Sequence, residues 1–160
     1  MNQPDWSNFL VAQAGAAAAL TGLIFVAVSI NLAKILEYPG VSGRAGEAVL
    51  VLLGVLLVST VALAPQQPAK ALGSELLVIG LTLWLAVTTS HFRLRRAGHL
   101  WWWTALRVAS CQLATVPFCL AGIWFLLGWR GAMYWLLPGC IFSFIAGVYS
   151  AWVLLIEILR

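Results

Sequence analysis

Residues 9–32 read FLVAQAGAAAALTGLIFVAVSINL, a run without a single charged side chain. An α-helix rises about 1.5 Å per residue, so roughly 20 apolar residues cross a hydrocarbon core about 30 Å thick. This stretch is therefore long enough to cross a bilayer as a helix. The helix is expected over residues 7–36, because Tyr38, Pro39 and Gly40 would stop it.

Four further apolar stretches follow, and the segments between them carry almost all of the charges. Hydrophobic residues make up 62% of the chain and charged residues 9%, whereas a soluble domain has about 45–50% and about 25%. This predicts an all-α polytopic membrane protein with five transmembrane helices that pack through small residues. A single transmembrane domain is expected over residues 1–160, with its later helices at 44–64, 72–94, 103–127 and 132–159.

The distribution of basic residues predicts the orientation. Five spans place the two termini on opposite sides of the membrane. Lys70 and Arg130 fall on one side, and the other seven Lys and Arg residues fall on the side of the C-terminus. The positive-inside rule puts the larger group in the cytoplasm, so the N-terminus is expected outside. Residues 1–5 carry no Lys or Arg, which predicts an uncleaved first helix rather than a signal peptide.

A basic cluster lies between the third and fourth helices, beside three consecutive tryptophans at residues 101–103. Such residues set topology, and each one near an anionic leaflet contributes about 1 kcal/mol of membrane binding. We expect this patch to contact the bilayer and its anionic lipids, or another membrane protein. The net charge of +4 follows from these membrane borders and predicts no nucleic-acid partner. The patch comprises Arg93, Arg95, Arg96, His99 and Arg107.

Two helices carry stripes of small residues at spacings of three, four and seven. Lipid tails are as apolar as leucine, so close packing through small residues joins helices in a membrane. These stripes predict helix contacts inside the bundle, between copies in a homo-oligomer, or both. The stripe of the first helix is Gly15, Ala18, Gly22 and Ser29, and that of the fifth is Gly139, Ser143, Ala146, Ser150 and Glu157.

Residues that carry chemistry are missing from the middle of the spans. The acids and both histidines fall at helix ends or in loops, and the sequence contains no HExxH motif and no CxxC motif. The three cysteines, Cys111, Cys119 and Cys140, are expected to act as small buried hydrophobes. We therefore expect no enzyme activity, no catalytic residue, no metal and no cofactor.

Uncharged polar residues do occur within the spans, and two functions would use them differently. They would line a homo-oligomeric pore that conducts a small solute or an ion. Alternatively they bond between helices, and the protein is a scaffold or regulator that binds lipids or other membrane proteins. The candidate lining is Gln13, Thr21, Asn31, Gln112 and Thr115. Gln112, Thr115, Cys119 and Gly122 share one face of the fourth helix.

Residues 9–32 also resemble the opening of a family of small, uncharacterised bacterial membrane proteins. Members of that family are sometimes labelled as modulators of the FtsH-type membrane protease. The resemblance covers roughly the first sixty residues and rests on the apolar residues 9–32. It implies a location in the bacterial inner (plasma) membrane, and it transfers no catalytic residue.

Overall fold

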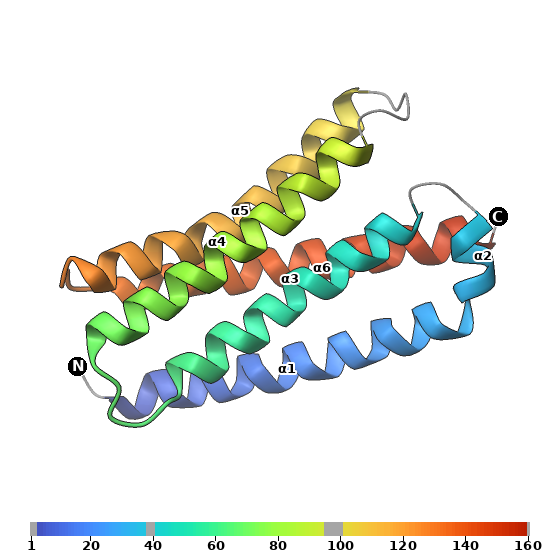
Figure 1. Cartoon of the computed structure of the whole chain (residues 1–160). Coiled ribbons are helices and arrows are strands. Elements are labelled where there is room, and N and C mark those ends of the chain that lie inside the picture. Colours follow the sequence, from blue (N-terminus) through green and yellow to red (C-terminus); the bar gives the residue numbers. More distant parts are fainter. Residues whose placement is uncertain (1–2, 38–40, 95–100, 160) are drawn as a thin grey trace.

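A computed structural model describes residues 3–37, 41–94 and 101–159 of the chain. Within these ranges, side chains are described for residues 6–35, 37, 43–90 and 108–153. Figure 1 shows long helices that run back and forth along one direction, with the described part of the chain free of strands.

Five helices are long and apolar enough to cross a membrane, which confirms the all-α, five-span prediction. The chain is therefore an integral membrane protein. A short helix, α2 (Leu32–Glu37), and a 3-10 turn, η2 (Ala132–Trp135), lie between the long helices. The long helices are α1 (Gln3–Ile30), α3 (Val41–Ala62), α4 (Ala69–Leu94), α5 (Trp101–Leu126) and α6 (Leu136–Leu159).

The first span differs from the expected continuous helix, because α1 ends at Ile30 and α2 begins at Leu32. The side-chain amide of Asn31 donates to the carbonyl oxygen of Ala27 at 2.9 Å, and the backbone N–H of Asn31 reaches the same oxygen at 3.3 Å. A short polar side chain that shares a helix carbonyl in this way competes with the regular backbone bond. The interruption at Asn31 is therefore encoded locally.

A glycine turn reverses the chain between α5 and α6. Gly128 adopts a φ of 69°, its N–H donates to the carbonyl of Phe125 at 3.2 Å, and the N–H of Trp129 donates to that of Trp124 at 3.0 Å. This is the left-handed helix ending that glycine permits without steric cost. Gly131, with a φ of 86°, then starts the 3-10 turn that leads into α6.

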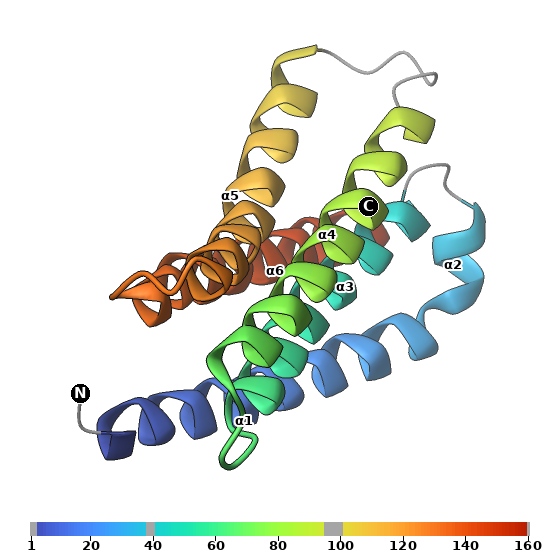
Figure 2. The ribbon, with the colours of Figure 1, turned by 60° about the vertical axis from the view of Figure 1, so that its left-hand side comes forward.

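The helix α3 lies in the middle of the bundle, with α1, α4 and α6 packed around it, and α5 packs on α4 and α6. One core cluster includes Leu10, Val58 and Phe118, and a second includes Ile24 and Val87 further along the bundle. The helices α4 and α5 pack on each other. Figure 1 shows their ends next to residues 95–100 standing apart from α3 and α6, and Figure 2 shows that these two ends also diverge from each other.

Aromatic rings gather near the turn that joins α5 to α6. The rings of Trp6 and Tyr134 meet edge to face with centroids 5.1 Å apart, which connects α1 to η2. Trp124 packs edge to face on Trp129 at 4.8 Å and also contacts Trp135. Tryptophan and tyrosine favour the membrane–water boundary, so this end of the bundle is suited to lie at one interface.

Candidate functional site

The small-residue stripe of the last span packs inside the bundle. Gly139 and Ala146 are buried, and the ring of Phe118 from α5 occupies the space beside Gly139. The hydroxyl of Ser143 donates to the backbone carbonyl of Ala114 on α5 at 3.4 Å. Ser150 is half-buried. This stripe therefore joins α6 to its neighbours within one copy of the chain, and Glu157, its expected continuation, lies outside the residues whose side chains are described.

The corresponding stripe of α1 faces away from the bundle. Its members Gly15, Ala18, Gly22 and Ser29 are all exposed, and a Cβ atom added at Gly15 or Gly22 would meet no atom within 4 Å. The residues of α1 that pack on the bundle, including Leu10, Ala17 and Ile24, recur every seven positions. At 3.6 residues per turn, the stripe lies about 140° around the helix from that packed face.

This outward surface of α1 is smooth over about three turns. No side chain on it extends beyond a methyl group, and larger exposed side chains, Val11 and Val26, stand at its two ends. We call it the α1 small face, and it consists of Ala12, Gly15, Ala18, Ala19 and Gly22.

Glycine has the opposite role between α4 and α5. A Cβ atom on Gly122 would lie 2.7 Å from the backbone nitrogen of Leu77 and 2.8 Å from the backbone oxygen of Gly73. A Cβ atom on Gly80 would lie 2.8 Å from the sulfur of Cys119. The backbones of α4 and α5 thus touch directly along a line, which we call the glycine seam, and Cys119 and Gly122 face this seam rather than a channel.

The predicted polar lining is divided between two helices that belong to different parts of the bundle. Gln13 and Thr21 lie on α1, which packs chiefly on α3, and Asn31 follows directly after it. Gln112 and Thr115 lie on α5, which packs on α4 and α6. The structure therefore does not bring the two halves of the lining together.

Most of these polar groups already have hydrogen-bond partners, either in their own helix or in the neighbouring helix. Thr21 donates its hydroxyl hydrogen to the carbonyl of Ala17 at 2.7 Å, and the buried Thr115 donates to the carbonyl of Cys111 at 3.0 Å. Gln112 accepts a hydrogen bond from the indole N–H of Trp84. Such bonds account for these polar groups without a solute in the bundle.

A buried acid is the feature that the sequence reasoning missed. The side chain of Glu47 on α3 is 1% exposed, and its Oε1 accepts a hydrogen bond of 3.0 Å from the hydroxyl of Ser90 on α4. The sequence places Glu47 near a helix end, which suggested a boundary position. Its spacing from Val51 and Val58, both buried on the same face of α3, is the signal that predicts burial.

No protein-family model, curated protein or solved structure matches the chain. The bacterial inner-membrane location implied by the resemblance of residues 9–32 therefore stays a prediction, as does the orientation.

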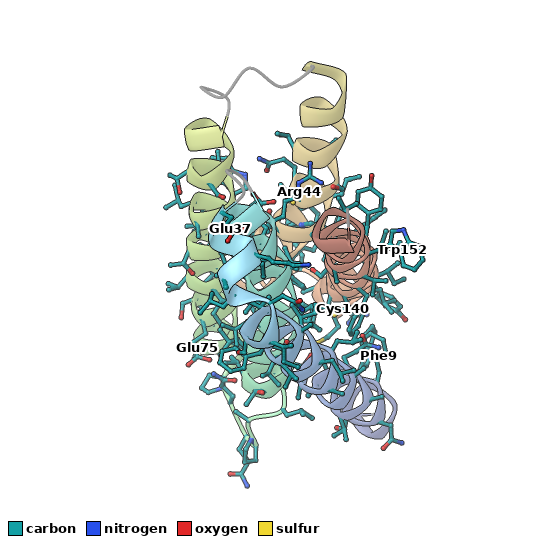
Figure 3. The ribbon with its side chains drawn as sticks, turned by 90° about the vertical axis from the view of Figure 1, so that its right-hand side faces the viewer. Phe9, Glu37, Arg44, Glu75, Cys140 and Trp152 are labelled. Carbon is teal, nitrogen blue, oxygen red and sulfur yellow. The ribbon has the colours of Figure 1, made fainter. Side chains whose placement is uncertain are left out.

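The predicted basic patch lies outside the described side chains, as do residues 91–107 as a whole. Among the basic residues that are described, Arg44 is half-buried, and Figure 3 shows it at the end of the bundle that carries α2 and Glu37. In the described part of the chain, no group of three His, Cys, Asp or Glu residues is placed to hold a metal ion. Figure 3 also shows Trp152, which is 63% exposed, pointing away from α6.

Proposed function

We propose that this chain is a non-enzymatic membrane scaffold that self-associates through the α1 small face. The observation that carries the proposal is the contrast between two sets of glycines. Gly73, Gly80, Gly122, Gly139 and Gly147 each press against a neighbouring helix, whereas Gly15 and Gly22 meet nothing. Glycine within a helix costs about 0.5–1 kcal/mol relative to alanine, and close approach of another helix offsets that cost. Gly46 on α3 also meets nothing, but Gly15 and Gly22 share one exposed face of α1 with Ala12, Ala18 and Ala19.

A second copy of the chain is the occupant that the surface favours. Gly15 with Ala19, and Ala18 with Gly22, form two overlapping small-xxx-small pairs on one surface. Two identical faces of this kind match each other about a two-fold axis, and their backbones approach closely enough for Cα–H···O contacts. Only 17% of the central apolar segment of α1 is buried, against 50% for that of α3, so α1 has the most surface left to pair.

The proposal predicts that Gly22→Leu weakens self-association. A leucine side chain would hold two copies of α1 apart, and we expect the dissociation constant in the bilayer to rise about tenfold, or about 1.4 kcal/mol. Energy transfer between donor- and acceptor-labelled copies, measured against the protein-to-lipid ratio, gives this constant. Gly46→Leu is the matched control, because Gly46 is also an open helical glycine but lies on α3.

Two outcomes contradict this function. One is a wild-type chain that stays monomeric at the highest protein-to-lipid ratio. The other is a Gly22→Leu chain that associates as strongly as the Gly46→Leu control. Equal weakening by both substitutions would also count against it, because the α1 small face would then have no special role.

A small-solute conduit is the second candidate, and one observation favours it. The hydroxyl oxygen of Ser59 on α3 is buried and has no hydrogen-bond partner. Leu10 and Ala17 of α1 share a core cluster with Val55 and Val58 of α3, so the antiparallel register puts Gln13 at about the depth of Ser59. A buried hydroxyl without a hydrogen-bond partner is uncommon, and such a group is able to bind a polar solute.

For the conduit, we expect Gln13→Leu to abolish the flux of small polar solutes into liposomes. Thr115→Val, which keeps the shape of this buried side chain, should leave the flux unchanged, because the hydroxyl of Thr115 is already bonded within its own helix. Release of an entrapped solute from vesicles with and without protein measures the flux. Wild-type vesicles that are no more permeable than protein-free ones would eliminate this candidate.

A further inference from the structure

The helices α4 and α5 form a hairpin that is closed from the level of Gly73 and Gly122 to the level of Thr88 and Gln112. The glycine seam joins their backbones at Gly73, Gly80 and Gly122. Further along, Gln112 of α5 accepts from the indole of Trp84 and donates to the hydroxyl of Thr88 at 3.3 Å, both on α4. Side chains cannot slip between backbones in direct contact, so the two helices would move together as one body.

The hairpin is attached to α3 in a different way. In the middle of the bundle, Leu83 of α4 sits against Gly54, where an added Cβ atom would lie 2.5 Å from Cδ1 of Leu83. Towards the end that carries α2, Val87 packs with Ala48, and then Ser90 donates its hydrogen bond to Glu47. Beyond this level the hairpin stands apart from α3 in Figures 1 and 2.

We propose that Glu47 and Ser90 form a latch, a reversible contact that holds the hairpin against α3. When it opens, the hairpin pivots about the contact between Leu83 and Gly54, and its free end separates further from α3. A hydroxyl–carboxylate contact suits this role because water can replace either partner as the helices part. An apolar pair of similar volume would hold the helices at least as firmly, so a buried acid here is not needed for stability alone.

Two of the three cysteines supply reporters for the test. Cys111 is 3% exposed and belongs to the core cluster that joins the hairpin to α3 and α6. Cys119 lies inside the hairpin, against Gly80. Full-length chains that keep only Cys111 or only Cys119, with alanine at the other two cysteine positions, separate opening of the latch from opening of the hairpin.

The expected result is faster labelling of Cys111 by N-ethylmaleimide in Ser90→Ala, measured in lipid nanodiscs. Loss of one interhelical hydrogen bond, about 0.6 kcal/mol on average, corresponds to about a threefold increase in rate if labelling follows opening. Thr89→Ala is the matched control and should not change the rate. The hydroxyl of Thr89 is exposed and bonds to the carbonyls of Leu85 and Ala86 in its own helix.

Cys119 distinguishes the latch from general loosening. Its labelling rate should be the same in Ser90→Ala and in the parent chain, because the glycine seam stays closed. A Cys111 rate that does not rise, or a Cys119 rate that rises by the same factor, would overturn the proposal. Glu47→Ala should raise the labelling rate of Cys111 further. If Glu47→Ala does not fold, Ser90→Ala alone still decides the test, since alanine at position 90 is a strong helix former.

Discussion

Gly122→Ala should lower the free energy of unfolding by about 3 kcal/mol, at the upper end of the usual cost of overpacking. The added methyl group would lie 2.7 Å from the backbone nitrogen of Leu77 and 2.8 Å from the backbone oxygen of Gly73. Backbone atoms cannot rotate away, so α4 and α5 would have to separate along the glycine seam. As α4 and α5 separate, the hydrogen bonds and dispersion contacts on either side of the glycine seam would also weaken.

Unfolding in mixed micelles with increasing denaturing detergent measures this loss. Gly46→Ala is the control, because a methyl group there meets nothing within 4 Å. We expect that control to be neutral or to gain up to about 1 kcal/mol, since alanine is the better helix former. Equal stability of Gly122→Ala and Gly46→Ala would mean that the two backbones are not in direct contact.

Phe118→Ala should destabilise the bundle by about 3–5 kcal/mol, the usual range for a buried aromatic residue. Phe118 is 1% exposed, and it packs in the core cluster that includes Leu10 of α1 and Leu136 of α6. Its ring also fills the space next to Gly139, where an added Cβ atom would lie 2.5 Å from the ring carbon Cε1. Removing the ring therefore leaves a cavity where α5 meets α6.

A double-mutant cycle tests this fit more sharply than either change alone. Gly139→Ala should cost about 1–3 kcal/mol in the parent chain, because its methyl group meets the ring. In the Phe118→Ala background the same methyl group enters the cavity, so the cost should fall by about 0.5–3 kcal/mol. The measurement is again unfolding by denaturing detergent. Strictly additive losses would show that Phe118 and Gly139 do not share a contact.

The sequence predicted the spans because length and apolar content are enough to identify a transmembrane helix. It did not predict the break at Asn31, which depends on where one short amide side chain points. Nor did it distinguish the stripe of α1 from that of α6. Gly22 and Gly139 lie in similar patterns, yet one faces outward and the other faces Phe118. Lipid and helix are equally apolar partners, so composition cannot separate the two cases.

Polar residues were the hardest to place from sequence. The sequence makes Thr115 a candidate to line a path, and the structure shows its hydroxyl bonded to the carbonyl of Cys111 in its own helix. The position of Glu47 near a helix end indicates a boundary residue, whereas the structure buries its side chain against α4. In both cases the outcome depends on which way a side chain turns and on which helix lies beside it. That information appears only when the helices are assembled.

The two environments of glycine also constrain how this chain is free to vary over evolution. At positions 73, 80 and 122 a side chain of any kind collides with a neighbouring helix, so drift at these sites is blocked by the fold itself. At positions 15 and 22 an added Cβ atom meets nothing within 4 Å, so the isolated fold leaves room for a side chain. If related sequences keep glycine at positions 15 and 22, a partner helix packs against α1. If they replace it freely, this face of α1 contacts lipid.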